Sequence, residues 1–240
     1  MSYLLYCIFR CPLPADLEIP AGVRGQRVFT ANYNGFGTVL SNLAEPDSPP
    51  DISTILAYET VVESFHCHLT VIPMQYGSRV ECPYEAIGLL RKNQDAYDAL
   101  LHELEGLAEM GIQLLLDNSG AGTASNPRPV LPRSIPLLCA SGAAYLAAKR
   151  QRYLGLDRAA LHERRLVEEV CGSLADFFVR RKAEIPESSR THLLSLYFLV
   201  PRNSVESFRR AAGHLHPQEP VKLLLSGPWP PYNFVDSLER

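Results

Sequence analysis

The chain has 240 residues, with 23 Lys and Arg against 26 Asp and Glu, a formal net charge of −3 and 46% hydrophobic residues. This composition is typical of a globular protein long enough for one large domain or two small ones. No apolar run reaches the roughly 18 residues that a membrane helix needs, so a membrane span is excluded.

The N-terminus lacks the basic start, apolar segment and cleavage pattern of a signal peptide, so we expect a cytoplasmic protein. Charge is divided unevenly along the chain. Residues 1–118 hold 6 basic and 15 acidic side chains, a balance of −9, whereas residues 119–240 hold 17 basic and 11 acidic ones, a balance of +6. The split indicates two domains or a polar association surface, although solvated helix faces that happen to differ explain it equally well. Nucleic-acid binding is not favoured, since no recognition motif accompanies the basic half.

The first elements read as β-structure. Tyr3 to Phe9 is apolar and aromatic and predicts an inner strand. Arg27 to Tyr33 and Phe36 to Leu43 predict two strands joined at Asn34-Gly35, a dipeptide that favours tight hairpin turns.

Helical spacing follows the proline-rich stretch that ends at Pro50. Asp51 is a candidate N-cap, and Ile52, Ile55, Val62 and Phe65 are predicted to share one face of a helix. A strand is then expected over Leu69 to Met74, and a second helix from Tyr84 to Gly111. The first half is thus α+β.

The second half opens with a predicted strand, Ile112 to Leu116, and a long Pro- and Gly-rich loop over residues 119–136. Residues 137–182 are predicted to be helical with a break at Gly155. The remaining predictions are a strand from Leu193 to Val200, a helix capped by Asn203 with Glu206, and a strand from Val221 to Leu225.

These elements predict an α+β fold with two domains. Residues 1–110 form the N-terminal mixed α+β domain. Residues 111–240 form a C-terminal domain that resembles a ferredoxin-like unit with its order altered and with long helices.

Six cysteines are too few for a disulfide scaffold in a chain of this length. A zinc site would draw on the neighbouring residues His66, Cys67 and His68 together with Cys82, but structural zinc sites need a second ligand pair that the sequence lacks. Buried free thiols are the favoured interpretation, and no metal or cofactor is predicted.

Catalytic motifs are weak. Residues 118–123 follow a strand and contain two glycines, but Ser125 occupies the third glycine position of a phosphate loop and prolines replace the helix start. Catalytic cysteine chemistry needs a positioned histidine and an electropositive site, which spacing alone cannot establish for Cys67 or Cys139. The carboxylates of Glu168 and Glu169 fit a solvated helix face. We therefore predict no catalytic residue and no enzyme.

The most unusual stretch is Leu223 to Val235, LLLSGPWPPYNFV, which contains the only tryptophan. Its three clustered prolines exclude a helix and stiffen the backbone. Trp229, Tyr232 and Phe234 would be held there at low entropic cost, either as a packing plug or as a binding anchor.

The same stretch carries a family resemblance, since SGPWPPYNFV resembles the C-terminal signature of the gas vesicle protein F and L family (GvpF/GvpL). Three further segments resemble that family's opening strand, its "LPMRFGT" segment and its penultimate strand: Tyr3 to Tyr6, Val71 to Ser78 and Leu196 to Pro201. GAAYLAAKR, Gly142 to Arg150, is similar to a family helix start. Two positions depart from the pattern: Tyr58 stands where histidine is expected, and Gln75 where a basic residue is expected.

The resemblance implies a non-enzymatic gas vesicle component or assembly factor of a prokaryote, located at the gas vesicle within the cytoplasm. It implies a partner, the small hydrophobic shell protein, and possibly other accessory proteins, together with a C-terminal modified ferredoxin fold. Our hypothesis is that the chain binds shell subunits and supports their nucleation or assembly. The candidate partner-binding residues are Met74, Tyr76, Gly77, Trp229, Pro230, Pro231 and Tyr232.

Two alternatives remain open at this point. One is a cytosolic ferredoxin-like protein that binds a small ligand at the glycine-containing loop near Asn118. The other is an enzyme that uses Cys67 with a histidine, for which a fast-reacting thiol is expected.

Overall fold

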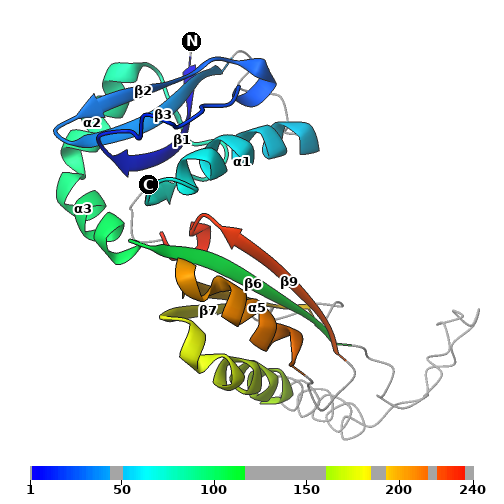
Figure 1. The fold of residues 1–240 in the computed structure, drawn as a ribbon. Coiled ribbons are helices and arrows are strands. Elements are labelled where there is room, and N and C mark those ends of the chain that lie inside the picture. Colours follow the sequence, from blue (N-terminus) through cyan, green and yellow to red (C-terminus); the bar gives the residue numbers. More distant parts are fainter. Residues whose placement is uncertain (1, 44–50, 117–160, 185–192, 216–220, 236–240) are drawn as a thin grey trace, which may run out of the picture.

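The computed structural model describes residues 2–43, 51–116, 161–184, 193–215 and 221–235 (Figure 1). These residues form a mixed α and β structure with two antiparallel sheets. The first sheet belongs to the N-terminal half and the second to the C-terminal half.

The first sheet has the strand order β2-β3-β1-β4, and β5 pairs with β1. Its strands are β1 (Ser2–Arg10), β2 (Val28–Tyr33), β3 (Phe36–Leu43), β4 (Val71–Pro73) and β5 (Arg79–Val80). The predicted inner strand and hairpin are confirmed. Asn34 and Gly35 both have positive φ, +46° and +83°, as the tight turn between β2 and β3 requires.

Helices cover both faces of this sheet. They are α1 (Ile52–His66), α2 (Pro83–Lys92) and α3 (Gln94–Glu103). α1 packs on Tyr6 and Phe9, whereas α2 and α3 pack on the face that carries Leu5 and Ile8. The Asp51 cap is confirmed, since its carboxylate accepts a hydrogen bond from the Thr54 amide at 2.8 Å. Hydrogen bonds from the side chain and the amide of Thr54, and from the Ser53 side chain, lower the pKa of Asp51 to about 2.

Two predictions for the N-terminal half are wrong. Ile52 and Ile55 are exposed, and the buried face of α1 is formed by Tyr58, Val62 and Phe65 among others. The helix predicted from Tyr84 to Gly111 is two short helices followed by a strand. The chain turns at Gly106, where φ is +69°, and then pairs along the second sheet.

The second sheet has the order β7-β8-β6-β9. Its strands are β6 (Leu107–Leu116), β7 (Arg180–Glu184), β8 (Leu193–Pro201) and β9 (Val221–Trp229). A helix over residues 161–173 and α5 (Val205–Gly213) pack on one face through a core that includes Met110, Phe198 and Phe208. The described order, β6, helix, β7, β8, α5, β9, is that of ferredoxin-like units.

Three predictions for the C-terminal half need correction. Arg180 to Lys182 form part of strand β7 instead of a helix, because pairing with β8 overrides local helix propensity. α5 is preceded by a short 3-10 helix, η4 (Arg202–Ser204), and Ser204 makes no side-chain cap, so the Asn203 capping box is absent there. β9 continues four residues beyond Leu225. The predictions for residues 119–136 and 137–160 lie outside the described residues.

The two halves share a core. Ile8, Ile72 and Leu104 from the N-terminal half pack in one cluster with Leu199 of β8 and Phe234. The domain boundary predicted between residues 110 and 111 falls inside strand β6, which is continuous from Leu107 to Leu116. The division into two domains stays a prediction. None of the described helices has the length and apolar character needed to cross a membrane.

Candidate partner-binding site

The C-terminal strip, residues 229–234, joins the end of β9 to the short 3-10 helix η5 (Tyr232–Phe234). Trp229 is 40% exposed, whereas Pro230, Pro231 and Phe234 are buried and Tyr232 is half-buried. The strip therefore has an outward-facing start and a buried end.

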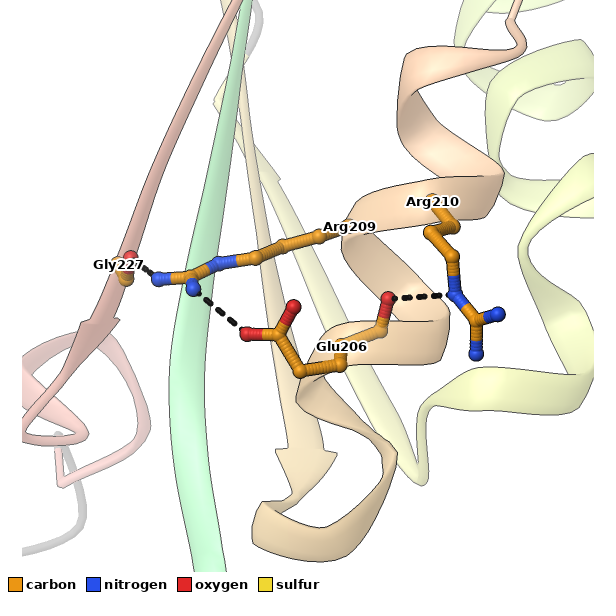
Figure 2. Close-up of polar contacts among 4 residues, drawn as sticks. All are labelled: Glu206, Arg209, Arg210 and Gly227. Atoms are coloured by element: carbon orange, nitrogen blue, oxygen red, sulfur yellow. Dashed lines mark hydrogen bonds and ion pairs between the residues drawn. The ribbon is translucent and has the colours of Figure 1, made fainter.

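The strand segment before the strip is held by α5 (Figure 2). Arg209 donates through Nη2 to the Gly227 carbonyl oxygen at 2.7 Å and pairs through Nη1 with Glu206 at 2.8 Å. Gly227 lies at φ +101°, and a Cβ there would come within 2.6 Å of the Glu109 carbonyl oxygen. Only glycine fits this irregularity in the antiparallel pairing of β9 with β6, and the irregularity sets the position at which the strip begins.

A buried carboxylate fixes the strip's last turn. Glu109 of β6 accepts hydrogen bonds from the amide nitrogen of Asn233 at 2.9 Å and from its Nδ2 at 2.6 Å. Burial raises the pKa of Glu109, and the Asn233 hydrogen bonds oppose that rise. Lys182 of β7 donates to the Asn233 carbonyl oxygen at 3.4 Å. The backbone and the side chain of Asn233 are thus both hydrogen-bonded to strands of the second sheet.

Phe234 connects the strip to the N-terminal half. Its ring lies in the shared core, and the Arg180 guanidinium stands 5.7 Å from the ring centroid. Arg180 also pairs with Glu103 of α3 at 3.2 Å. The strip therefore packs between the two sheets.

Tyr58 of α1 lies beside the candidate partner-binding residues of the N-terminal half, Met74 to Gly77. Its hydroxyl is 2.7 Å from the Met74 carbonyl oxygen, 2.9 Å from that of Leu5 and 3.2 Å from that of Tyr6, so its single proton is shared among three acceptors. Burial raises the pKa of Tyr58 well above its usual value. Tyr58, which stands where the family pattern has histidine, is therefore a core residue that joins α1 to the first sheet.

The structure brings both predicted segments to the cluster around Tyr58. The ring of Tyr76 meets that of Tyr58 edge-on, with centroids 5.3 Å apart, and Tyr232 packs against the same cluster from the strip. Met74 and Tyr76 are half-buried, and Gly77 is exposed at φ +94°. The Tyr232 hydroxyl is buried without a hydrogen-bond partner among the described residues, and burial raises its pKa.

A second contact between the halves escaped the sequence analysis. Arg202 of η4 donates through Nη2 to the His66 carbonyl oxygen at the end of α1, and the same atom lies 3.0 and 3.1 Å from the two ring nitrogens. Burial and the adjacent guanidinium lower the pKa of His66 to about 3, so the ring is neutral at pH 7. The two residues are 136 positions apart, and no local pattern relates them.

The cysteines and the possible metal ligands do not gather into one site within the described residues. Cys7 and Cys171 are buried free thiols, and burial raises the pKa of both. Cys67 and Cys82 are exposed and unbridged, and no group of three or more His, Cys, Asp or Glu within the described ranges could hold a metal ion. The glycine-containing segment at 118–123 and Cys139 lie outside those ranges. What the described site offers is a fixed backbone that presents an exposed indole.

The fold and the strip define a mixed α and β protein with two antiparallel sheets joined by a C-terminal strip. The family described as "Gas vesicle synthesis protein GvpL/GvpF" matches residues 2–236. The chain belongs to this family, which makes it a gas vesicle component.

The chain is also similar to curated gas vesicle proteins. The chain is 24% identical over 227 residues to gas vesicle protein F1 of Halobacterium salinarum, covering 92% of this chain and 88% of the relative. It is 23% identical over 226 residues to gas vesicle protein F of Haloferax mediterranei, covering 92% and 87%.

The fold is similar to two crystal structures of GvpF. The one from Anabaena sp. PCC7120 gives a TM-score of 0.71 at 18% identity, with 99% of this chain and 97% of the other covered. The one from Microcystis aeruginosa gives 0.72 at 16% identity, with 98% of each chain covered. These matches confirm the fold.

Proposed function

We propose that this chain is a non-enzymatic assembly component in the cytoplasm that binds the small hydrophobic shell protein and supports nucleation or growth of the gas vesicle. Family membership supports a gas vesicle role. The observation that carries the binding step is the exposure of Trp229 at the start of a strip whose remaining residues are fixed. A rigid, exposed aromatic ring binds apolar surface at low entropic cost.

A shell subunit that polymerises must carry apolar patches or strand edges that aggregate when they are left uncovered. A partner that covers them during assembly needs a preformed apolar contact of its own. In this proposal Trp229 and Gly77 supply exposed surface, and Met74, Tyr76 and Tyr232 support it from the cluster around Tyr58. Pro230 and Pro231, which are buried, hold the direction of the strip.

The test is a pull-down of purified shell subunit with the intact chain and with Trp229→Ala. We expect the variant to retain its fold, because the indole is 40% exposed, and to lose most of the captured subunit. Tyr84→Ala is the matched control, since Tyr84 is an exposed aromatic residue on α2.

Three outcomes are distinguishable. Capture by the intact chain and the control but not by Trp229→Ala supports the proposal. Equal capture by all three proteins removes the strip from the interface. Absence of capture by the intact chain contradicts shell binding altogether.

A further inference from the structure

Strand β9 is an edge of the second sheet. It pairs with β6 on one side and with no described strand on the other, and Figure 1 shows it alongside β6 at the margin of that sheet. In an edge strand every second residue points its backbone N–H and C=O groups away from the neighbouring strand. β9 therefore presents a row of backbone donors and acceptors to which another strand can pair.

The unprotected part of this strand is Val221 to Ser226, which we call the β9 edge. Beyond it, Arg209 binds the Gly227 carbonyl oxygen at 2.7 Å, Pro228 has no N–H group, and the pairing with β6 is irregular. Covering side chains, prolines and bulges are features by which proteins block the addition of a strand. Here they are confined to residues 227–228, so a segment as long as an ordinary strand is left without them.

The opposite edge of the same sheet is built differently. β7 has the sequence RRKAE, in which only the alanine is uncharged, whereas the β9 edge contains a single charged residue, Lys222. Charged residues on an edge strand oppose pairing with another chain. β7 is thus protected by its sequence, and the β9 edge is open to pairing.

The two faces of the β9 edge specify the side chains of an added strand. Val221, Leu223 and Leu225 are half-buried against the core beneath the helices. Between them, Lys222 and Leu224 are exposed on the opposite face. A strand beside β9 would place every second side chain next to the first set, where apolar residues extend the core, and the others next to Lys222 and Leu224.

The N-terminal half packs on the other end of this sheet. The shared core reaches Leu199 and Tyr197 of β8. Tyr197 pairs with Gly111, and Gly111 pairs with Ser226, so residues 221–225 lie beyond that level. The β9 edge therefore lies at the end of the sheet that is farther from the shared core.

Among the described residues, charge at the β9 edge is positive. Lys222 is flanked on β6 by Gln113 and Leu115, which are uncharged, and Arg209 near Gly227 already pairs with Glu206. The charged residues of β7 lie four strand spacings from an added strand, roughly 19 Å, which exceeds the screening length of about 8 Å at physiological ionic strength. A carboxylate opposite Lys222 is therefore the complementary group.

An acidic strand suits this edge better than a second copy of the chain. Two β9 edges paired with each other would give Lys222 no carboxylate, because residues 221–229 contain none. The shell subunit is the partner proposed for Trp229, which ends the same strand. Continuity along β9 favours one partner for the edge and for the indole.

We propose that the β9 edge binds an extended segment of the shell subunit as an added strand, with apolar residues at alternate positions and an Asp or Glu opposite Lys222. The proposed edge contact rests on the proposed function. It adds the mode of contact, which is backbone pairing at a sheet edge, and the segment of β9 that makes it.

Hydrogen exchange resolved by residue tests the backbone pairing. In the intact chain alone, alternate amides of residues 221–226 should exchange fast, because they point outward from the sheet. Saturation with purified shell subunit should slow those amides at least about tenfold. The amides of β7, at the other edge of the sheet, are the internal control and should keep their rates.

Model peptides test the sequence of the added strand. One peptide of about six residues alternates Val and Thr and carries a central Glu, and a second carries Lys in its place. The intact chain should bind the Glu peptide about threefold more tightly, and Lys222→Glu should reverse the preference. N-methyl groups along one edge of the Glu peptide should abolish binding, and those along its other edge should not, because a single peptide edge pairs with β9.

Leu224→Lys and Gln113→Lys separate the edge from the sheet face. Gln113 lies opposite Leu224 on β6, and both side chains are exposed, so both variants should keep the fold. Leu224→Lys should weaken binding of shell subunit about tenfold or more, because a second cation enters the paired edge. Gln113→Lys, one strand further in, should bind within about twofold of the intact chain.

Three outcomes would overturn the edge contact and leave shell binding in place. One is binding of shell subunit while the amides of residues 221–226 keep their rates. Another is an equal loss from Gln113→Lys and Leu224→Lys, which would assign the contact to the sheet face. The third is binding of neither model peptide, or equal binding of both, which would exclude the acidic strand.

Two results with the intact chain alone would also overturn it. Outward amides that are already slow in dilute solution would show that the edge is covered. Slowing that grows with the concentration of the chain would assign the edge to a second copy. If shell subunit does not bind the intact chain at all, the proposed function fails, and the edge contact fails with it.

Discussion

The C-terminal strip has two parts with opposite environments. Trp229 ends strand β9 and is 40% exposed, whereas Asn233 and Phe234, four and five residues later, are held between the two halves of the molecule. The larger aromatic residue is thus the one that contributes less to the core. The comparison teaches that a proline-stiffened strip can fasten the fold at one end and leave an aromatic side chain partly exposed at the other.

The largest loss of stability is expected from Phe234→Ala. The change leaves a cavity in the core shared by both halves and removes the ring beneath Arg180, so the free energy of unfolding should fall by about 3 to 5 kcal/mol. Urea unfolding measures it. Trp229→Ala truncates a larger side chain that is 40% exposed and lies in none of the buried clusters, so it should cost less than Phe234→Ala, and equal losses would contradict the division of the strip.

Asn233→Asp should cost about 3 kcal/mol at pH 7, because it places a second carboxylate against the buried Glu109. The loss should shrink as the pH falls toward 5, since a proton on either carboxyl restores a hydrogen-bond donor. Urea unfolding at both pH values measures this. Asn233→Ala adds no charge and should lack that relief on acidification. An Asp variant equally unstable at both pH values would count against a buried contact.

His66 should make the fold sensitive to acid. Its pKa is lowered from 6.5 to about 3 in the folded state, so the unfolded chain takes up the proton first and stability is lost as the pH falls below 6.5. The expected loss from this residue is about 2 kcal/mol between pH 8 and pH 5.

The measurement is the difference in pH dependence between the intact chain and His66→Gln, which should lack this loss. His68→Gln, at an exposed histidine two residues further on, is the control. Identical pH profiles for the intact chain and His66→Gln would show that burial and the contact with Arg202 do not hold the ring neutral.

The smallest effect is expected from Tyr232→Phe. The Tyr232 hydroxyl is buried without a partner among the described residues, so its removal should leave stability unchanged or raise it by up to about 1 kcal/mol. Thermal unfolding measures the change. Tyr58→Phe, which removes a hydroxyl that serves three carbonyl oxygens, should be destabilising. A clear loss of stability in Tyr232→Phe would indicate a bound partner for that hydroxyl.

Local signals in the sequence predicted local structure well. Asn34-Gly35 fixed the hairpin because both residues tolerate positive φ, and Asp51 marked the start of α1 because its carboxylate caps the first turn. Strand β7 was missed because its residues, RRKAE, lack apolar alternation. They form a charged edge strand whose pairing is supplied by β8. Helical spacing groups Ile52 and Ile55 with the buried Val62 and Phe65, but both are exposed, because spacing alone does not say which residues meet the sheet.

The site divides in the same way. The proline pattern indicates residues 229–232 as a candidate site, but it does not predict which of them are buried. That was decided by Glu109, which lies 124 residues before Asn233, and by the shared core around Phe234.

The amino-acid sequence by itself determined the family, the α+β class and the stiffness of the C-terminal strip, because these depend on residue types and short spacings. Only the tertiary structure decided that the strip lies between the two halves and that His66 meets Arg202. The physical reason is that burial and long-range hydrogen bonds depend on which distant segments meet, and chain order does not specify that.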